Sequence, residues 1–193
     1  QSMTASVSNT AVFTASATSI AQAGSYDIEV TQLAQAQKLV TSDTQRFSAV
    51  TDVVGTGVLS FQVGSNAVQN ITIDSSNQTL EGVRDAINKA NVGARASIIH
   101  DGQGFRLAIS ASNSGVANSL KITVTGDSVG SDTDQTGLSR LAYDPAAAVD
   151  SGRNMTQTLA AQDALLKVDG LDVTSASNSV VGVVPGVTLS LKS

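Results

Sequence analysis

The stretch from Thr56 to Ser112 constrains the fold most, because its hydrophobic period changes twice. Apolar and polar residues first alternate, which is the period of half-buried strands. Apolar residues then recur at spacings of three and four, the period of an amphipathic helix, before alternation returns. The alternating stretches are 59–63, 70–74, 94–100 and 105–110, and the helical stretch is 79–90. This order predicts a ββαββ unit, in which a short helix lies across an antiparallel sheet.

The predicted helix has an apolar face and recognisable ends. Its apolar stripe consists of Leu80, Val83, Ile87 and Ala90. Thr79 or Asn77 can accept a free amide at the helix start. Asn91 and Gly93 follow the stripe, and both residue types tolerate the left-handed backbone that ends a helix. We therefore expect the stripe to pack on the sheet.

The composition narrows the class of protein. The chain has 193 residues, enough for one domain or two small ones. Only 3% of the residues are aromatic, which favours thin β layers over a cavity lined with rings. The net charge of −5 argues against nucleic acid or an anionic membrane as partner, since both attract basic surfaces. There is no cysteine and no run of the ~18–20 apolar residues that a membrane span needs.

The segments that flank the central unit also alternate. Further strands are expected at 25–31, 38–41, 120–125, 164–168, 171–174 and 187–191, a helical turn at 115–118 and edge-strand material at 4–18. Ser42 to Val54 is interpreted as a polar bridge, and Leu138 to Thr158 has only weak periodicity. Because the outer segments are too short for separate domains, we expect residues ~20–46 and ~159–191 to share one sheet.

The predicted fold class is mainly β with one or two short helices (α+β). It comprises two small antiparallel β-sandwich-like domains, one inserted into the other. Residues 4–47 and 157–193 form the discontinuous domain, and residues 48–156 form the inserted domain, which contains the unit at 56–112. Gln1-Ser2-Met3 is typical of a protease-site remnant left by expression, and no signal peptide follows it.

Two groups of residues could carry chemistry in a loop or turn. His100, the only histidine, could serve a Ser–His–Asp triad or be a surface residue before a turn. Asp127, Asp132 and Asp134 could bind calcium, but no bidentate glutamate stands at the required offset, which favours a solvated loop.

Two further patterns invite a catalytic or ligand-binding interpretation. Gly102-Gln103-Gly104 lies in a β-turn and not before a helix, so it does not indicate a phosphate cradle. Asp27 and Glu29 could be a glycosidase pair, but they lie on the polar side of a strand and fit a role in solubility. We therefore predict no catalytic, cofactor-binding or metal-binding residue.

Several motifs resemble one family. Gly24 to Leu39 is similar to a characteristic segment of hook-associated protein 2, the bacterial flagellar filament cap family. Gly57 to Leu107 resembles a module that is also found in flagellins and other hook-associated proteins. Stretches 164–170, 177–178 and 185–191 resemble the region in which the chain of that family returns from its head towards its leg.

The resemblance implies a non-enzymatic protein without cofactors, exported through the flagellar channel without a cleaved signal peptide. It would form a ring-like cap at the extracellular filament tip and guide flagellin into place. Flagellin, other axial proteins and further copies of the cap would be its partners. The long heptad-patterned segments of the family's legs are missing here, so the resemblance is to the head, which should be monomeric or weakly associating alone.

A second class of protein remains open at this point. Ser/Thr/Gly-rich β domains are also typical of extracellular adhesins and carbohydrate-binding modules. Sugar sites usually stack rings on Trp or Tyr, whereas this chain has no Trp and only Tyr26 and Tyr143. The composition therefore favours the flagellar interpretation.

Overall fold

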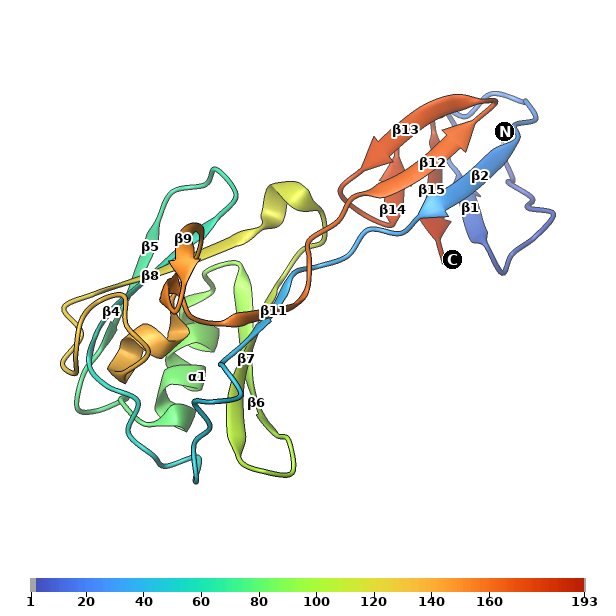
Figure 1. Cartoon of the computed structure of the whole chain (residues 1–193). Coiled ribbons are helices and arrows are strands. Elements are labelled where there is room, and N and C mark those ends of the chain that lie inside the picture. Colours follow the sequence, from blue (N-terminus) through green and yellow to red (C-terminus); the bar gives the residue numbers. More distant parts are fainter. Residues whose placement is uncertain (1–2, 193) are drawn as a thin grey trace. The chain divides into compact units, whose positions relative to one another are not determined.

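The computed structural model describes residues 3–192, and the chain divides into two compact units (Figure 1). Unit 1 comprises residues 1–35, 114–116 and 161–193, and unit 2 comprises residues 36–113 and 117–160. The expected protease-site remnant falls on residues 1–3, of which the first two lie outside the described residues. The predicted fold class is confirmed, since strands predominate and nearly all pair antiparallel.

Unit 2 contains two sheets and one α-helix. The five-stranded sheet has the order β10-β9-β8-β4-β5 and consists of β4 (Gly57–Val63), β5 (Gln69–Ile73), β8 (Leu120–Thr125), β9 (Tyr143–Val149) and β10 (Ser151–Arg153). The four-stranded sheet has the order β11-β3-β7-β6 and consists of β3 (Lys38–Val40), β6 (Ala94–His100), β7 (Phe105–Ala111) and β11 (Thr156–Leu159). The helix α1 (Leu80–Ala90) packs against β6 and β5, and two 3-10 turns span Val116–Asn118 and Gly137–Leu141.

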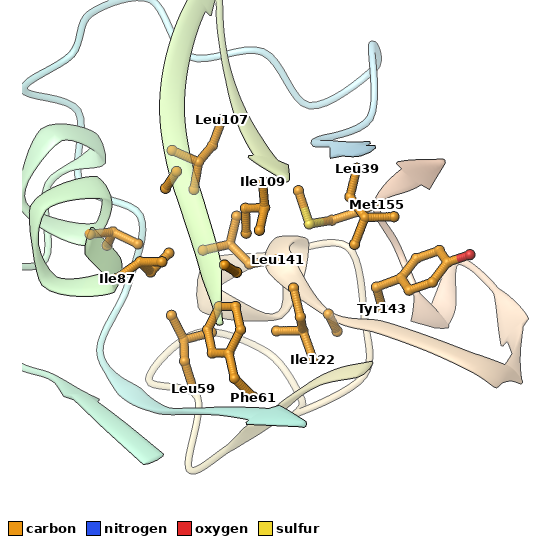
Figure 2. Close-up of a cluster of buried hydrophobic side chains, with 14 of the residues drawn as sticks. Leu39, Leu59, Phe61, Ile87, Leu107, Ile109, Ile122, Leu141, Tyr143 and Met155 are labelled. Carbon is orange, nitrogen blue, oxygen red and sulfur yellow. The ribbon is translucent and has the colours of Figure 1, made fainter. Parts of the chain in front are cut away.

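The core of unit 2 forms where the inward faces of these elements meet (Figure 2). Leu59 and Phe61 of β4 alternate with outward-facing polar residues, as the period of two requires. Ile109 enters from β7 and Ile87 from α1, and both are fully buried. The predicted stripe of the helix is confirmed for Leu80, Val83 and Ile87, whereas its fourth predicted member, Ala90, is exposed at the end of the helix.

The free amides at the start of α1 are hydrogen-bonded by the helix cap and by an adjoining segment. Thr79, one of the two predicted caps, accepts the Gly82 amide through Oγ1 at 3.1 Å. The Leu80 amide donates to the Asp52 carbonyl at 2.9 Å, and the Glu81 amide donates to a neighbouring carbonyl at 3.0 Å. At the other end, Asn91 adopts the predicted left-handed conformation with φ of 51°. The helix N-terminus is therefore engaged within the fold.

Unit 1 is built from two three-stranded sheets around a smaller core. One sheet has the order β1-β15-β14 and consists of β1 (Phe13–Ala17), β14 (Ser179–Val181) and β15 (Val187–Leu191). The other has the order β13-β12-β2 and consists of β2 (Ile28–Gln32), β12 (Ala164–Val168) and β13 (Leu171–Ser175). Leu166, Val180 and Leu189 are among the residues buried in this core.

The division into units differs from the predicted boundaries. Unit 2 begins at residue 36 and not at 48, because β3 pairs with β7 and β11 and its Leu39 enters the core of unit 2. The expected polar bridge at 42–54 belongs to the same core, since Phe47 and Val54 are 3% and 2% exposed. The larger apolar residues of this segment, Phe47, Val50, Val53 and Val54, follow neither a helix nor a strand period, so the sequence did not predict this anchoring.

The outer segments form two sheets and not the single sheet that was expected. β1 pairs with β15, whereas β2 pairs with β12, so each sheet has one strand from the first part of the chain and two from the last. Tyr26, expected within a strand, precedes β2, and the intervening Asp27 donates its amide to the Asp169 carboxylate at 2.8 Å. Residues 138–158, left unassigned from the sequence, contain a 3-10 turn and short strands.

Candidate functional site

The only histidine supports a turn. His100 is the last residue of β6, and its Nδ1 accepts the Gly102 amide at 3.1 Å. Its ring also contacts Phe105 edge to face, with 4.7 Å between the ring centroids. Both contacts stabilise the β6–β7 hairpin, which is a structural role.

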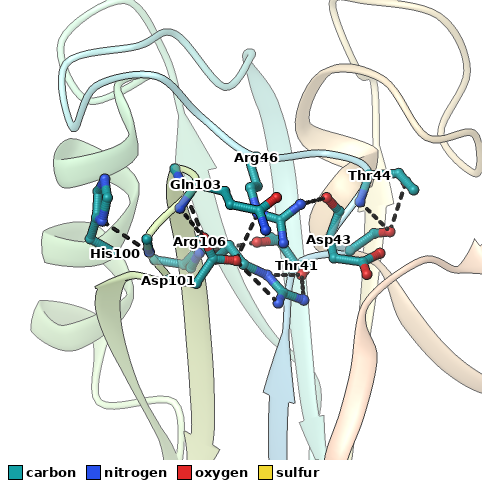
Figure 3. A network of polar contacts seen from close by, with 12 residues as sticks. Thr41, Asp43, Thr44, Arg46, His100, Asp101, Gln103 and Arg106 are labelled. Atoms are coloured by element: carbon teal, nitrogen blue, oxygen red, sulfur yellow. Dashed lines mark hydrogen bonds and ion pairs between the residues drawn. The ribbon is translucent and has the colours of Figure 1, made fainter.

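The turn after His100 directs its amides towards a carboxylate of the same turn (Figure 3). Asp101 Oδ1 accepts the amides of Gln103 and Gly104 at 3.0 and 3.2 Å. Its Oδ2 lies 2.7 Å from Arg46 Nε and 3.6 Å from a guanidinium nitrogen of Arg106. These amides already have an acceptor, so they do not form a phosphate cradle.

The same contacts set the charge state of Asp101. Burial of the carboxylate acts to raise its pKa. The Arg46 side chain and the two turn amides favour the charged form and together outweigh burial, so the pKa lies below the ordinary value. The carboxylate therefore remains charged near neutral pH and holds the hairpin to the segment that carries Arg46.

Arg106 extends this network to the start of that segment. It donates two hydrogen bonds, of 2.9 and 2.6 Å, to the Thr41 carbonyl. Thr41 is fully buried, and its hydroxyl accepts the Leu107 amide at 3.1 Å. Arg46 also donates to the Asp43 carbonyl (Figure 3). The network thus anchors residues 41–46 to β7.

The three loop aspartates bind backbone amides of their own loop. Asp127 Oδ2 accepts the amide and hydroxyl of Ser139 at 2.6 and 2.5 Å. Asp132 accepts the Asp127 amide at 2.8 Å, and Asp134 accepts the Thr136 amide at 2.8 Å. The Thr136 hydroxyl, followed by backbone amides, lowers the pKa of Asp134. Within residues 3–192, no group of three His, Cys, Asp or Glu side chains is placed to hold a metal ion.

The proposed carboxylate pair also lies on the surface of a sheet. Glu29 stands opposite Lys167 in the β2–β12 register, and Asp27 lies just before β2. A shallow depression of about 190 Å³ lies beside them, lined by Asp27, Ile28, Glu29, Lys167 and Gly170. Glu29 therefore faces a basic side chain across the strands, which fits the surface role expected of the pair.

Two polar residues of unit 2, Arg140 and Asn154, have structural roles that the sequence did not predict. Arg140 lies over the Phe47 ring at 4.3 Å and donates to the carbonyls of Gly137 and Val54 at 2.9 and 3.1 Å. Burial lowers its pKa. Asn154, 3% exposed, donates to three loop carbonyls close by. Neither residue belongs to a periodic pattern, so only the folded structure reveals their role.

No chemical centre emerges from these contacts, because each candidate stabilises a turn, a loop or a strand face. Among residues 3–192, no helix has the length and apolarity needed to cross a membrane. In the described structure, the features left to consider for function are the surfaces of the two units and the cores that support them.

Comparison with known families gives two matches at the ends of the chain. The family model described as flagellar hook-associated protein 2 N-terminus matches residues 1–37. The model described as flagellar hook-associated protein 2 C-terminus matches residues 161–193.

Full-length relatives match across nearly the whole chain. The B-type flagellar hook-associated protein 2 of Pseudomonas aeruginosa is 39% identical over 98% of this chain and 40% of its own length. The flagellar hook-associated protein 2 of Escherichia coli K12 is 37% identical over 93% of this chain and 36% of its own length. The chain thus spans about two fifths of the length of these relatives.

Solved structures are similar over both units. The crystal structure of the D2-D3 domains of the flagellar cap protein FliD from Escherichia coli has a TM-score of 0.84 and 33% identity, and the match covers 96% of this chain and 89% of that chain. The crystal structure of FliD (HAP2) from Pseudomonas aeruginosa PAO1 has a TM-score of 0.77 and 35% identity, with 95% and 79% covered.

Proposed function

The chain belongs to the flagellar hook-associated protein 2 family, and on this premise we propose that it is the head portion of a flagellar filament cap, which promotes flagellin assembly at the filament tip. The observation that carries the proposal is the match of both units, in one alignment, to the D2-D3 domains of the Escherichia coli cap protein. We assign unit 1 and unit 2 to these two domains, with the discontinuous unit nearer the filament and the inserted unit further out.

The role is structural, without catalysis and without a cofactor. Support comes from the side chains most suited to chemistry, which are engaged in the fold. His100 and Asp101 hold a hairpin turn, and Asp127 and Asp134 hold a loop. A cap requires a stable shape and defined surfaces, and the two cores supply the first of these.

The partners follow from the same premise. The full-length protein contacts flagellin and other axial proteins and forms a ring, while this chain alone is monomeric or weakly associating. It is exported through the flagellar channel, without a cleaved signal peptide, and lies outside the cell at the filament tip. The adhesin alternative is disfavoured, because Tyr143 is 7% exposed and only Tyr26 is available to stack on a sugar.

Filament growth tests the proposal. A flagellated strain that lacks the full-length gene would receive either the intact gene or one without the codons for residues 36–160, with the exposed substitution Lys89→Ala as matched control. We expect the intact gene and Lys89→Ala to restore filaments. The deletion should release flagellin into the medium as monomer. Normal filaments from the deletion strain, despite secretion of the shortened protein, would contradict the proposal.

A further inference from the structure

The charges of the chain are distributed unequally between the two units. Unit 2 contains nine of the eleven basic residues and eleven acidic ones, whereas unit 1 contains two basic and five acidic residues. The net charges are therefore −2 for unit 2 and −3 for unit 1, although unit 1 is the smaller of the two. Overall acidity does not describe the individual faces of such a molecule.

One face of unit 1 carries a row of charges across three strands. Lys167 of β12 is in register with Glu29 of β2 on one side and with Asp172 of β13 on the other. All three side chains are exposed, and Lys167 Nζ lies 3.5 Å from Asp172 Oδ1. Asp27 and Asp169, also exposed, lie at the end of the same strands. We call Glu29, Lys167 and Asp172 the acidic row.

One face of unit 2 carries a row of the opposite charge, in which two basic residues flank a serine across three strands. Ser110 of β7 is in register with Lys38 of β3 on one side and with Arg95 of β6 on the other. Lys38 and Arg95 are exposed, because their neighbours Leu39 and Ala96 point into the core. Arg95 gives one hydrogen bond to the Asn88 carbonyl at 3.3 Å, which leaves its other donors available. We call Lys38, Ser110 and Arg95 the basic row.

Among the described residues, the outward-facing positions of the sheet that carries the basic row hold no acidic side chain. The outward-facing residues beside it are Ser97, Ile99, Arg106, Ala108, Thr156 and Thr158, whereas Val40 is buried. The nearest carboxylate at the end of this sheet, Asp101, is already paired with Arg46 and Arg106. Among the described residues, therefore, no carboxylate is in register with Lys38 or Arg95 on this sheet.

The two rows match in spacing as well as in sign. Neighbouring strands lie about 4.8 Å apart, so the outer members of each row are about 10 Å apart. When the sheets face each other, Glu29 and Asp172 can lie over Lys38 and Arg95, with Lys167 over the small Ser110. Two residues further along each central strand, the exposed Leu165 would meet the small Ala108.

From this match we propose that the basic row of one copy binds the acidic row of a second copy of the chain. The contact joins different surfaces of the two copies, which is the kind of interface that propagates or closes into a ring. It deepens the cap function proposed above and rests on it for its biological meaning. The contact itself can form between any two copies of the chain in solution.

The contact is weak and sensitive to salt. Three strands by about five residues cover roughly 10 by 16 Å, far below the ~800 Å² per partner of a stable interface. Exposed ion pairs contribute little individually, and salt screens them within about 10 Å at 0.1 M. The isolated chain should therefore be largely monomeric at micromolar concentration and associate when concentrated at low ionic strength.

Charge reversal in both rows tests the inference by sedimentation of the concentrated chain at about 20 mM and about 500 mM salt. We expect association at low salt only. Lys38→Glu with Arg95→Glu should abolish it, and so should Glu29→Lys with Asp172→Lys. A mixture of these two variants should associate again, because each then offers rows that only the other complements. Arg84→Glu with Lys89→Glu on α1 is the control of equal charge change and should behave as the parent.

Several outcomes would overturn the inference. These are a parent chain that stays monomeric at low salt, row variants that associate as the parent does, or a mixture that stays monomeric although thermal melting shows both variants folded. Association of the basic row with another acidic protein, in place of a second copy, would also overturn it. Since the readout is self-association of the isolated chain, failure here leaves the filament-growth test of the proposed function intact.

Discussion

At the scale of single residues, two asparagine side chains take the place of a neighbouring strand. Asn178 accepts the Ala34 amide at 2.7 Å and donates to the Ala34 carbonyl at 3.0 Å. Asn88 on α1 does the same for Ala96 of the edge strand β6, at 2.8 and 2.9 Å. A primary amide can donate and accept at once, as a peptide group does. These side chains therefore satisfy backbone groups that the sheets leave unpaired.

Asn178→Leu should destabilise unit 1 by about 1–3 kcal/mol, because it leaves the buried amide and carbonyl of Ala34 unpaired. Chemical denaturation followed by circular dichroism measures this. The neighbouring exposed Ser179 supplies the control, Ser179→Ala, with an expected change within about 0.5 kcal/mol. Equal stability of the two variants would mean that the Asn178 bonds contribute no net free energy.

Acid should weaken unit 2 through its carboxylates. Those with a lowered pKa are Asp74, Asp85, Asp101, Asp134 and Asp144, and all belong to unit 2. A lowered pKa in the folded state means that the unfolded state binds more protons as the pH falls below about 3.9. The stability that these groups contribute is therefore present above pH 4 and is lost below it.

Asp101→Asn should remove one such contribution. At pH 7 the variant should be less stable than the parent, and the difference should shrink as the pH falls from 4 to 2.5, because the parent carboxylate then also becomes neutral. Thermal melts across this range measure the difference. Asp43→Asn, at an exposed position of the adjoining segment, serves as control. A difference independent of pH would show that the charge of Asp101 does not stabilise the hairpin.

At the scale of elements, α1 is the part best specified by its local sequence. Three of the four predicted stripe residues are buried, and the cap is Thr79, one of the two candidates, because a helix of three turns repeats its signal several times. The same holds for β4, β6 and β7, whose alternation covers seven residues each. Long periodic segments contain enough positions to distinguish a strand from a helix and an inner face from an outer one.

The placement of short elements could not be predicted in this way. β3 has three residues, and nothing in them specifies whether they pair with β2's sheet or with β7. Phe47 and Arg140 belong together only because a distant loop brings the guanidinium over the ring. For the candidate site, residue types alone led us to expect no catalytic or metal-binding residue. The partners of His100 and Asp101 became visible only in the folded hairpin.

Ile87→Asp should unfold unit 2, because Ile87 is fully buried and an unpaired carboxylate beneath α1 would cost several kcal/mol. Lys89→Ala, on the exposed side of the same helix, should change stability by no more than about 0.5 kcal/mol. Thermal melts of both variants provide the comparison. Similar melting of the two would mean that the assigned face of the helix is wrong.

At the scale of the whole molecule, each unit has its own apolar core. Calorimetry of the chain should therefore show two transitions, since separate cores need not unfold together. The larger enthalpy should belong to unit 2, which contains more residues. Ile87→Asp should remove that transition and leave the smaller one. A single transition lost entirely in this variant would show that the units do not fold independently.

The central claim is that the chain belongs to a cap at the end of the flagellar filament, and its position on the filament tests this most directly. Antibodies raised against residues 3–192 and marked with gold would be applied to intact flagellated cells for electron microscopy. We expect label confined to the distal tip of each filament, and none on a strain that lacks the gene. Label along the filament shaft, or on the cell body as expected of an adhesin, would contradict it.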